Sequence, residues 1–276
     1  SNDNAISLNG FALLAMTVRA SPEIIARSKK PDPTNPRTDA AAARILAAAG
    51  ATCVIADIDA ASAASVAGEI DGTVAMMDVG DPAAWRALVE HHGPFDLAVL
   101  NAGVATNQLK PDGALPVLEL DDERYRRIMS VNVDGVVYGA REVLRHMVAT
   151  GTGDVLVTAS VAGLAPIAPD PIYGLTKHAV VGFVRSMAAA IDQHPEPIDV
   201  HISAVCPGFA DTNILADDAK DMIRTLGLPI MQPEQVATTM LRALAERRNG
   251  AQWVVWAGRD DEAYEWTPVI DLMDPA

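Results

Sequence analysis

Short apolar runs alternate along this chain with stretches whose apolar residues recur at helical spacing. The runs are rich in Val, Ile and Leu and contain few polar residues, which is typical of strands buried on both faces. This pattern predicts strands in residues 10–18, 52–57, 73–79, 96–103, 154–160, 199–206 and 253–258. It predicts helices in residues 40–49, 60–70, 82–90, 121–149 and 234–247, and a further helix led by Tyr173.

The regular succession of strand and helix predicts an α/β fold. We expect a Rossmann-type doubly wound parallel sheet with helices on both faces and right-handed crossovers. No low-complexity linker interrupts the pattern, so we interpret residues 1–276 as one domain. Ligands of such a sheet bind at the carboxyl ends of its strands, and candidate site residues are therefore sought there.

The composition narrows the choice of partners and compartment. The chain has 21 Lys and Arg against 36 Asp and Glu, a formal net charge of −15, which argues against nucleic acid or an anionic membrane as partner. We interpret Cys53 and Cys206 as small buried residues of strands rather than a disulfide, which favours a cytoplasmic location. The chain begins without the basic region of a signal peptide, and no run approaches the ~18 apolar residues of a membrane span. The six histidines lack metal-ligand spacing, so no metal site is expected.

One stretch carries the groups needed for proton transfer to an alcohol or carbonyl. Tyr173 and Lys177 are four residues apart, so both side chains leave the same face of a helix. A cation at that distance favours the phenolate, and we expect it to lower the pKa of the phenol from its usual ~10. Ser160 ends the preceding strand, and the proline-containing loop between them is long enough to bring its hydroxyl beside the phenol.

The segments SVAG and YGLTK resemble the active-site signature of the short-chain dehydrogenase/reductase family. Local similarity to the 15-hydroxyprostaglandin dehydrogenase type extends through PIYGLTKHAVVGF and CPGFADTNIL. The resemblance implies an NAD-dependent oxidoreductase that interconverts a secondary alcohol and a ketone. In it, Tyr173 is the general base or acid, Lys177 tunes the phenol and holds the nicotinamide ribose, and Ser160 donates to the substrate oxygen.

NVDG resembles the fourth catalytic position of the family, where an Asn in a locally opened helix holds a water. The residue is Asn132, in the middle of the expected helix 121–149, where an asparagine is unfavourable without a reason. A plain polar residue at a helix interface is the alternative.

Further positions match residues that bind the dinucleotide in the family. Asp57 ends the second strand, where a carboxylate can accept hydrogen bonds from both ribose hydroxyls and repel a 2′-phosphate, which favours NAD over NADP. Alternatively, Asp57 caps the next helix, a role that Asp59 could equally fill. The remaining positions are the adenine pair Asp78 and Val79, the strand-end run Asn101, Ala102 and Gly103, and the nicotinamide-binding Pro207, Gly208 and Thr212.

Residues 211–230 are expected to form a substrate lid, and residues 259–276 an irregular C-terminal arm. The apolar residues of the lid suggest an apolar alcohol or ketone substrate, although they could instead belong to a subunit interface or to the core. The family mostly assembles as homodimers or homotetramers through the helix 121–149 and the helix led by Tyr173, and the small residues on these helices allow that here.

One part of the family pattern is missing. The glycine-rich turn TG-x-x-x-G-x-G should follow the first strand and bind the pyrophosphate, but residues 11–49 contain no glycine. The atypical region 1–38 instead holds several prolines, which offer no amide hydrogen. Residues 18–38 could bind the pyrophosphate in another way, could have lost cofactor binding, or could record a shift in reading frame. The alternative function is therefore a catalytically silent Rossmann-like protein that acts as a partner subunit or ligand sensor.

Overall fold

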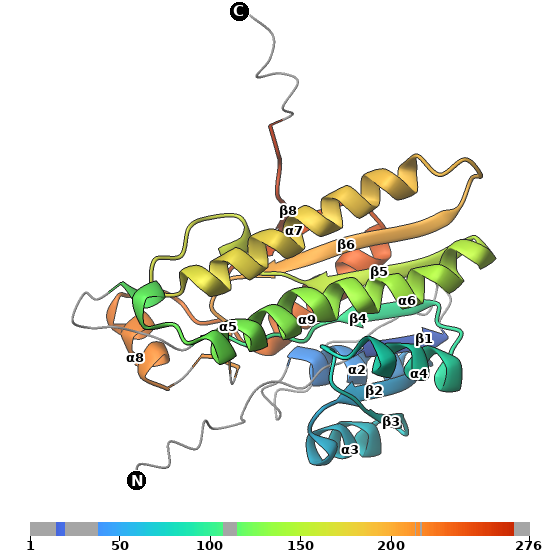
Figure 1. Ribbon diagram of the computed structural model, residues 1–276, viewed down its shortest axis with the longest axis horizontal. Helices are drawn as coiled ribbons and strands as arrows, with labels where there is room; N and C mark the ends of the chain where they lie inside the picture. The colour runs from blue at the N-terminus through green and yellow to red at the C-terminus, as the bar shows by residue number, and fades with distance from the viewer. Residues whose placement is uncertain (1–14, 20–37, 107–114, 213, 216, 268–276) are drawn as a thin grey trace, which may run out of the picture.

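The computed structural model describes residues 15–19, 38–106, 115–212, 214–215 and 217–267. Within these residues one sheet is formed in the order β3-β2-β1-β4-β5-β6-β7-β8, with helices on both faces (Figure 1). The strands are β1 (Ala15–Arg19), β2 (Thr52–Asp57), β3 (Thr73–Met76), β4 (Leu97–Leu100), β5 (Thr152–Thr158), β6 (Asp199–Pro207), β7 (Gln252–Val255) and β8 (Glu262–Ala263).

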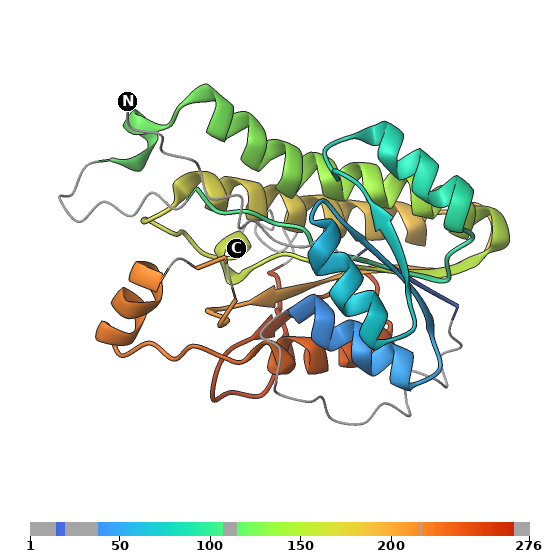
Figure 2. The same cartoon turned by 90° about the horizontal axis from the view of Figure 1, so that it is seen from below.

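The helices form two layers that enclose the sheet. They are α2 (Thr38–Ala48), α3 (Ala60–Glu69), α4 (Pro82–His92), α5 (Asp122–Met129), α6 (Gly135–Thr150), α7 (Pro171–Asp192), α8 (Asp217–Thr225) and α9 (Pro233–Glu246), with short turns η1 (Pro116–Glu119), η2 (Ser130–Asp134) and η3 (Val161–Gly163). One core lies beneath α4, α6 and α7, and a second beneath α2, α3 and α9. Figure 2 shows α6 and α7 on one side of the sheet and α2 and α9 on the other.

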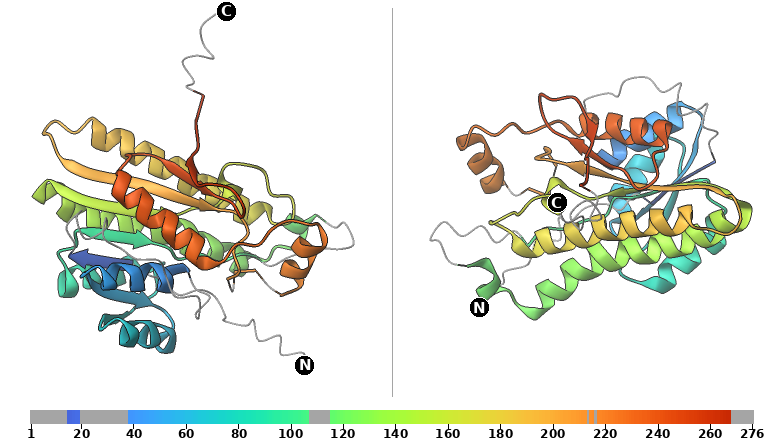
Figure 3. Two further views of the ribbon diagram at one scale, coloured as in Figure 1. Left: turned by 180° about the vertical axis from the view of Figure 1, so that it is seen from behind. Right: turned by 90° about the horizontal axis from the view of Figure 1, so that it is seen from above.

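The central strands are buried on both faces, as their apolar sequences predict. In β5 the side chains of Val155 and Val157 belong to the core beneath α6 and α7, whereas Leu156 between them belongs to the opposite core. Alternate residues of a strand point to opposite faces, so a strand with helices on both sides must be apolar throughout. The Rossmann-type α/β fold with helices on both faces is therefore confirmed, and the view from behind in Figure 3 shows α9 and α2 covering the second face.

The direction of β1 differs from the expected parallel arrangement. The described strand is β1, Ala15–Arg19, whereas residues 10–14 of the expected strand lie outside the described residues. β1 runs antiparallel to both neighbours, with Thr17 opposite Val54 of β2 and Ala15 opposite Leu100 of β4. The other central pairs, β2 with β3 and β4 through β7, are parallel. A strand can pair in either direction, and the sequence pattern of a short run does not specify which.

The reversal of β1 moves the end of this strand to the other edge of the sheet. Arg19, its last residue, pairs with Thr52, the first residue of β2, so β1 ends at the amino edge. A turn directly after β1 is therefore at the opposite edge from the carboxyl ends of the parallel strands, where dinucleotides bind.

Two other segments depart from the expected elements. The predicted helix 121–149 consists of α5 and α6 joined by η2, where one turn widens to a π-helix. The C-terminal arm is not wholly irregular, because β8 pairs with β7 and Trp266 donates a hydrogen bond from Nε1 to Oε1 of Gln252 at 2.6 Å. Cys53 and Cys206 are both free and buried, as expected.

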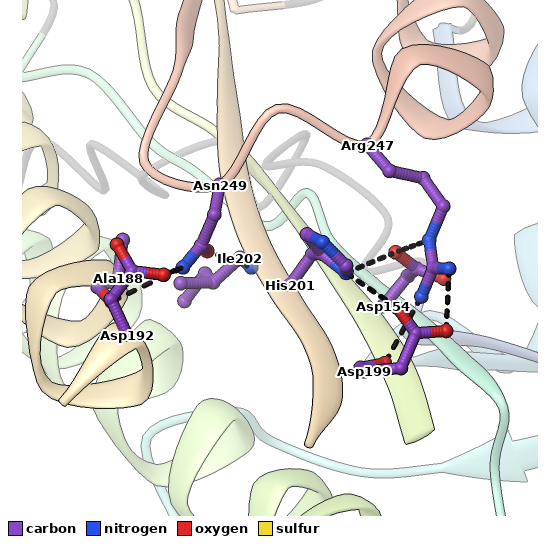
Figure 4. A network of polar contacts seen from close by, with 8 residues as sticks. All are labelled: Asp154, Ala188, Asp192, Asp199, His201, Ile202, Arg247 and Asn249. Atoms are coloured by element: carbon purple, nitrogen blue, oxygen red, sulfur yellow. Dashed lines mark hydrogen bonds and ion pairs between the residues drawn. The ribbon is translucent and has the colours of Figure 1, made fainter. Parts of the chain in front are cut away.

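A polar network joins α9 to the amino edge of the sheet (Figure 4). Arg247, the residue that ends α9, donates from Nε to Asp154 at 3.0 Å and from Nη1 to Asp199 at 2.7 Å. Its backbone is left-handed, with φ 47°. Asn249 extends the network, accepting from the backbone N–H of Ile202 and donating to the carbonyl oxygen of Ala188. These contacts stabilise the edge of the sheet opposite the candidate site.

Candidate active site

The four candidate catalytic residues come from three elements that meet at the carboxyl end of the sheet. Ser160 follows the end of β5, Tyr173 is in the first turn of α7, Lys177 is one turn further along α7, and Asn132 is in η2. α7 packs against η2, η3 and β6, which holds these segments together.

Asn132 is buried, and its amide is bonded to protein groups on both sides. Oδ1 accepts from the backbone N–H of Val104 at 2.8 Å, while Nδ2 donates to the carbonyl oxygen of Val104 at 2.9 Å and to Oγ1 of Thr176 at 3.0 Å. Asn132 therefore fixes the loop after β4 and binds it to α7. These bonds agree with the alternative of a structural polar residue, and the catalytic role of Asn132 stays a prediction.

Lys177 is 2% exposed, and its ammonium donates to the carbonyl oxygen of Thr158 at 2.9 Å. Burial lowers the pKa of Lys177 to about 8. The ammonium nitrogen lies 5.6 Å from the centre of the Tyr173 ring. Adding a Cβ to Gly103 would place it 3.4 Å from the same nitrogen, so the strand-end glycine lies beside the lysine.

The expected lowering of the Tyr173 pKa does not hold in this structure. Burial raises the pKa of Tyr173 to about 12, the hydroxyl of Ser160 opposes that rise, and the charge of Asp170 adds to it. The ammonium of Lys177 donates to Thr158 instead of the phenol, so desolvation of the phenolate is the larger effect. The phenol therefore keeps its proton at neutral pH.

Ser160 is 8% exposed and belongs to the same polar cluster. Its hydroxyl oxygen accepts from the backbone N–H of Ala162 at 3.1 Å and donates to the carbonyl oxygen of Pro207 at 3.4 Å. The latter contact joins the end of β5 to the end of β6. Ser160 thus lies between the phenol and the CPG segment.

Three residues of this cluster were missed by the sequence analysis. Thr158 donates from its hydroxyl to Oδ1 of Asn101 at 2.7 Å, and Thr176 donates from its hydroxyl to the carbonyl oxygen of Tyr173 at 2.8 Å. Asp170 caps α7. An Asp directly before a proline is a recognisable helix start, so the sequence did contain a signal for Asp170.

The residues expected to bind the adenosine half lie at the ends of β2 and β3. Asp57 is 0% exposed and accepts from the backbone N–H of Asp59 at 2.9 Å, while Asp59 itself caps α3. Asp78 accepts from the backbone N–H of Gly80 at 2.8 Å. Val79 is buried against Gly135. The helix-capping role considered for Asp57 therefore belongs to Asp59.

The segment expected to bind the nicotinamide follows β6. Gly208 donates its backbone N–H to Val255 at 2.9 Å, and a Cβ at this glycine would collide with the ring of Trp256. Thr212 is half-buried, and its backbone N–H donates to Ala210 at 2.8 Å. These residues lie beside Ser160 through Pro207, whose carbonyl oxygen accepts from the serine.

The expected lid contains the short helix α8. Ile223 of α8 is buried, whereas Met222, Leu226 and Leu228 are exposed. Lys220 forms an ion pair with Asp211 at 2.8 Å, which ties α8 to the segment after β6. This segment therefore has buried and exposed apolar side chains, and its role as a lid stays a prediction.

A protein-family model described as short chain dehydrogenase matches residues 40–223. The chain belongs to the short-chain dehydrogenase family. The match begins within α2, so the atypical region that precedes the helix lies outside it.

Other short-chain dehydrogenases are similar in sequence and in structure. 2-Keto-3-deoxy-L-fuconate dehydrogenase of Xanthomonas campestris pv. campestris is 32% identical over 231 residues, which cover 82% of this chain and 72% of that protein. The human 15-hydroxyprostaglandin dehydrogenase (NAD+) is 30% identical over 186 residues, which cover 60% of this chain and 63% of that protein. The crystal structure of a gluconate 5-dehydrogenase from Burkholderia cenocepacia J2315, in complex with NADP and tartrate, has a TM-score of 0.65 at 26% identity and covers 79% of this chain and 88% of that one.

As a short-chain dehydrogenase, the protein is an oxidoreductase that acts on alcohol or ketone groups, and its family uses NAD(P). In the described parts of the chain, no helix has both the length and the apolar character needed to cross a bilayer. Among the same residues, no three His, Cys, Asp or Glu side chains are grouped so as to bind a metal.

Proposed function

We propose that this short-chain dehydrogenase interconverts a secondary alcohol and a ketone with NAD, using Ser160, Tyr173, Lys177 and Asn132. The observation that supports this proposal is the meeting of these four residues at the carboxyl end of the sheet, where Asn132 and Lys177 are buried and hydrogen-bonded. Burying a lysine is costly, because the interior disfavours its charge. Such a group is therefore a candidate for function.

Tyr173 is the group that transfers the proton. A phenol with a pKa of about 12 is protonated at neutral pH and is ready to donate to a ketone oxygen during reduction. In oxidation the phenolate accepts the proton of the alcohol. Ser160 donates to the same substrate oxygen, Lys177 would hold the nicotinamide ribose, and Asn132 holds a water for proton relay. The nicotinamide, when bound, supplies or accepts the hydride.

The residues fit the nicotinamide half of the cofactor. The ends of β4 and β6 are close to Lys177, and Gly103 allows close approach because it has no Cβ. Asn101, Ala102, Pro207, Gly208 and Thr212 complete the residues that would hold this half.

The adenosine half fits less well. Asp57, which would select NAD over NADP, has no exposed surface, so it must become accessible before a ribose can bind. Asp78 would contact the adenine amino group, and Val79 its ring. Because β1 ends at the amino edge, the pyrophosphate cannot bind a turn directly after this strand. These observations favour a second candidate, a chain that keeps the family fold but binds dinucleotide weakly and acts as a partner subunit or ligand sensor.

We propose an apolar substrate, because the exposed side chains of α8 and the residue that follows it include Met222 and Leu226. We also propose that the protein is one domain, located in the cytoplasm, and assembles as a homodimer or homotetramer through α6 and α7. Light scattering coupled to size exclusion measures the assembly, and a monomer at micromolar concentration would contradict this part of the proposal.

Cofactor binding and turnover test the function directly. We expect millimolar NAD to raise the melting temperature more than NADP, because a ligand that binds only the folded state stabilises it. We expect oxidation of NADH with apolar ketones. A protein whose melting temperature responds to neither dinucleotide, and which reduces no ketone, would support the second candidate instead.

A further inference from the structure

The carboxylate of Asp170 connects two segments that are distant in sequence. Oδ1 accepts from the backbone N–H of Tyr173 at 2.9 Å, as is usual for a helix cap. Oδ2 accepts from the backbone N–H of Thr106 at 2.8 Å, although the two residues are 64 positions apart. Asp170 is 9% exposed and Thr106 is 6% exposed, so the second bond is shielded from water.

This second bond distinguishes Asp170 from ordinary helix caps. Asp81 and Asp121 cap α4 and α5, and each accepts from one backbone N–H of its own helix. Neither needs a partner elsewhere in the chain to fulfil that role. The contact with Thr106 is therefore not explained by the capping of α7.

The loop after β4 is held at two points as a result. Asn132 binds both the N–H and the carbonyl oxygen of Val104, and Asp170 binds Thr106 two residues later. This loop follows Gly103, which lies beside Lys177, so it forms one wall of the catalytic cluster. The carboxylate of Asp170 joins this loop to the first turn of α7, which carries the phenol.

We propose that Asp170 is a positioning residue for the reaction, which fixes the loop after β4 to the first turn of α7 and acts on Tyr173 through its charge. The inference rests on the proposed function, because it gives Asp170 a part in the reaction of Tyr173.

The groups around the phenol support an electrostatic contribution from Asp170. Tyr173 faces Ser160 after β5, Cys206 of β6, Lys177 of its own helix and Asp170 at the helix start. Burial raises the pKa of Tyr173, Ser160 lowers it, and the negative charge of Asp170 raises it further. Removing that charge should therefore make the phenol more acidic.

The variants Asp170→Asn and Asp170→Glu test the inference, with Asp121→Asn as the matched control. An asparagine has one acceptor oxygen, so it loses at least one of the two bonds and the charge. A glutamate keeps two acceptor oxygens and the charge. Asp121→Asn removes the charge of a cap that lies on α5, and melting temperatures establish that all three variants fold.

Hydrogen exchange measured by mass spectrometry requires no substrate. We expect Asp170→Asn to speed exchange in residues 101–106, and Asp121→Asn to leave that segment unchanged. Unchanged exchange in Asp170→Asn would overturn the positioning role. This comparison tests the positioning role of Asp170 even if the protein turns over no alcohol or ketone. The absence of turnover would contradict the proposed function and leave the positioning role unaffected.

The pH profile of alcohol oxidation tests the effect of the charge. The acid limb of kcat should move to lower pH in Asp170→Asn and remain near the wild-type position in Asp170→Glu and Asp121→Asn. A purely structural loss would lower kcat at every pH without moving the limb. An unmoved limb in Asp170→Asn would therefore refute an action on Tyr173.

Discussion

The side-chain amide of Asn132 donates to the hydroxyl of Thr176 across 3.0 Å, and that hydroxyl donates to the carbonyl oxygen of Tyr173 at 2.8 Å. The π-helical turn and α7 are thus connected through two side chains. The same amide binds both polar groups of the Val104 backbone. We therefore expect Asn132 to contribute to the stability of the site.

We expect Asn132→Leu to lower the free energy of unfolding by roughly 2–4 kcal/mol, because it leaves several buried polar groups without a partner. Urea unfolding monitored by circular dichroism measures the change. Asn132→Asp should also destabilise, since its second oxygen would face the carbonyl oxygen of Val104. A loss below about 1 kcal/mol in both variants would show that these bonds contribute little.

Tyr173→Phe should reduce kcat by about 10²–10⁴-fold, which is the usual contribution of a positioned acid or base. The melting temperature should change little, because the ring is retained. Tyr138→Phe on α6 is the control, since Tyr138 is half-buried beside Arg141 and outside the catalytic cluster. Equal activity of Tyr173→Phe and the wild type would eliminate the phenol as the proton-transferring group.

Lys177→Met should stabilise the fold at neutral pH. Burial lowers the pKa of Lys177 to about 8 in the folded protein, against about 10.5 when unfolded. Between these two pH values the unfolded chain binds more protons than the folded protein. The free energy of unfolding of the wild type therefore rises as the pH increases from about 8 to about 10.5. Below pH 8 the lysine is charged in both states, and the whole cost of burying the charge is present. That cost is about 3 kcal/mol at most.

At pH 7, Lys177→Met should therefore have a larger free energy of unfolding than the wild type. At pH 9.5 the difference between the two should be smaller. Urea titrations at both pH values provide the measurement. A variant that is less stable at pH 7 would mean that the hydrogen bond to Thr158 outweighs the cost of burying the charge.

Gly103→Ala should fold normally and bind dinucleotide less well. Its Cβ would lie 3.4 Å from Nζ of Lys177 and 3.7 Å from Oδ1 of Asn132, which is ordinary contact. It would occupy space that the nicotinamide ribose needs, and we expect a loss of affinity of about tenfold, or 1.4 kcal/mol. Titration monitored by tryptophan fluorescence measures this.

Gly163→Ala provides the contrast, because its Cβ would lie 2.5 Å from the backbone oxygen of Lys177. Such overpacking typically costs about 1–3 kcal/mol of stability. If Gly103→Ala bound the cofactor as well as the wild type, the end of β4 would not contact the nicotinamide half.

Arg247→Ala should lower stability by about 2 kcal/mol, because it removes the guanidinium that pairs with the largely buried carboxylate of Asp154; the pair is partly accessible to water, which limits the loss. Arg247→Gly removes the same side chain but also relieves the left-handed backbone, which costs about 1 kcal/mol for other residues. Arg247→Gly should therefore be the more stable of the two in thermal unfolding. The opposite order would show that φ 47° is not strained at this position.

The order of elements and the helix that carries Tyr173 and Lys177 could be predicted from the sequence because both follow from local patterns. The strands β2, β4 and β5 and the helices α2, α4 and α9 lie within a few residues of their expected positions. Tyr173 and Lys177 share a helix face because their spacing places them there. The second partner of Asp170 was not predictable in this way, since Thr106 is 64 residues distant.

The amino-acid sequence by itself determined which runs are strands and helices, which family the chain resembles, and which residues supply a hydroxyl, a phenol and an ammonium. The tertiary structure alone decided the direction of β1, because the sequence of a short strand does not determine whether it pairs parallel or antiparallel with its neighbours. It also decided the acidity of Tyr173. The helical spacing indicated an attractive cation, but only the packed structure shows how much water the phenol loses and that Lys177 donates to Thr158 instead.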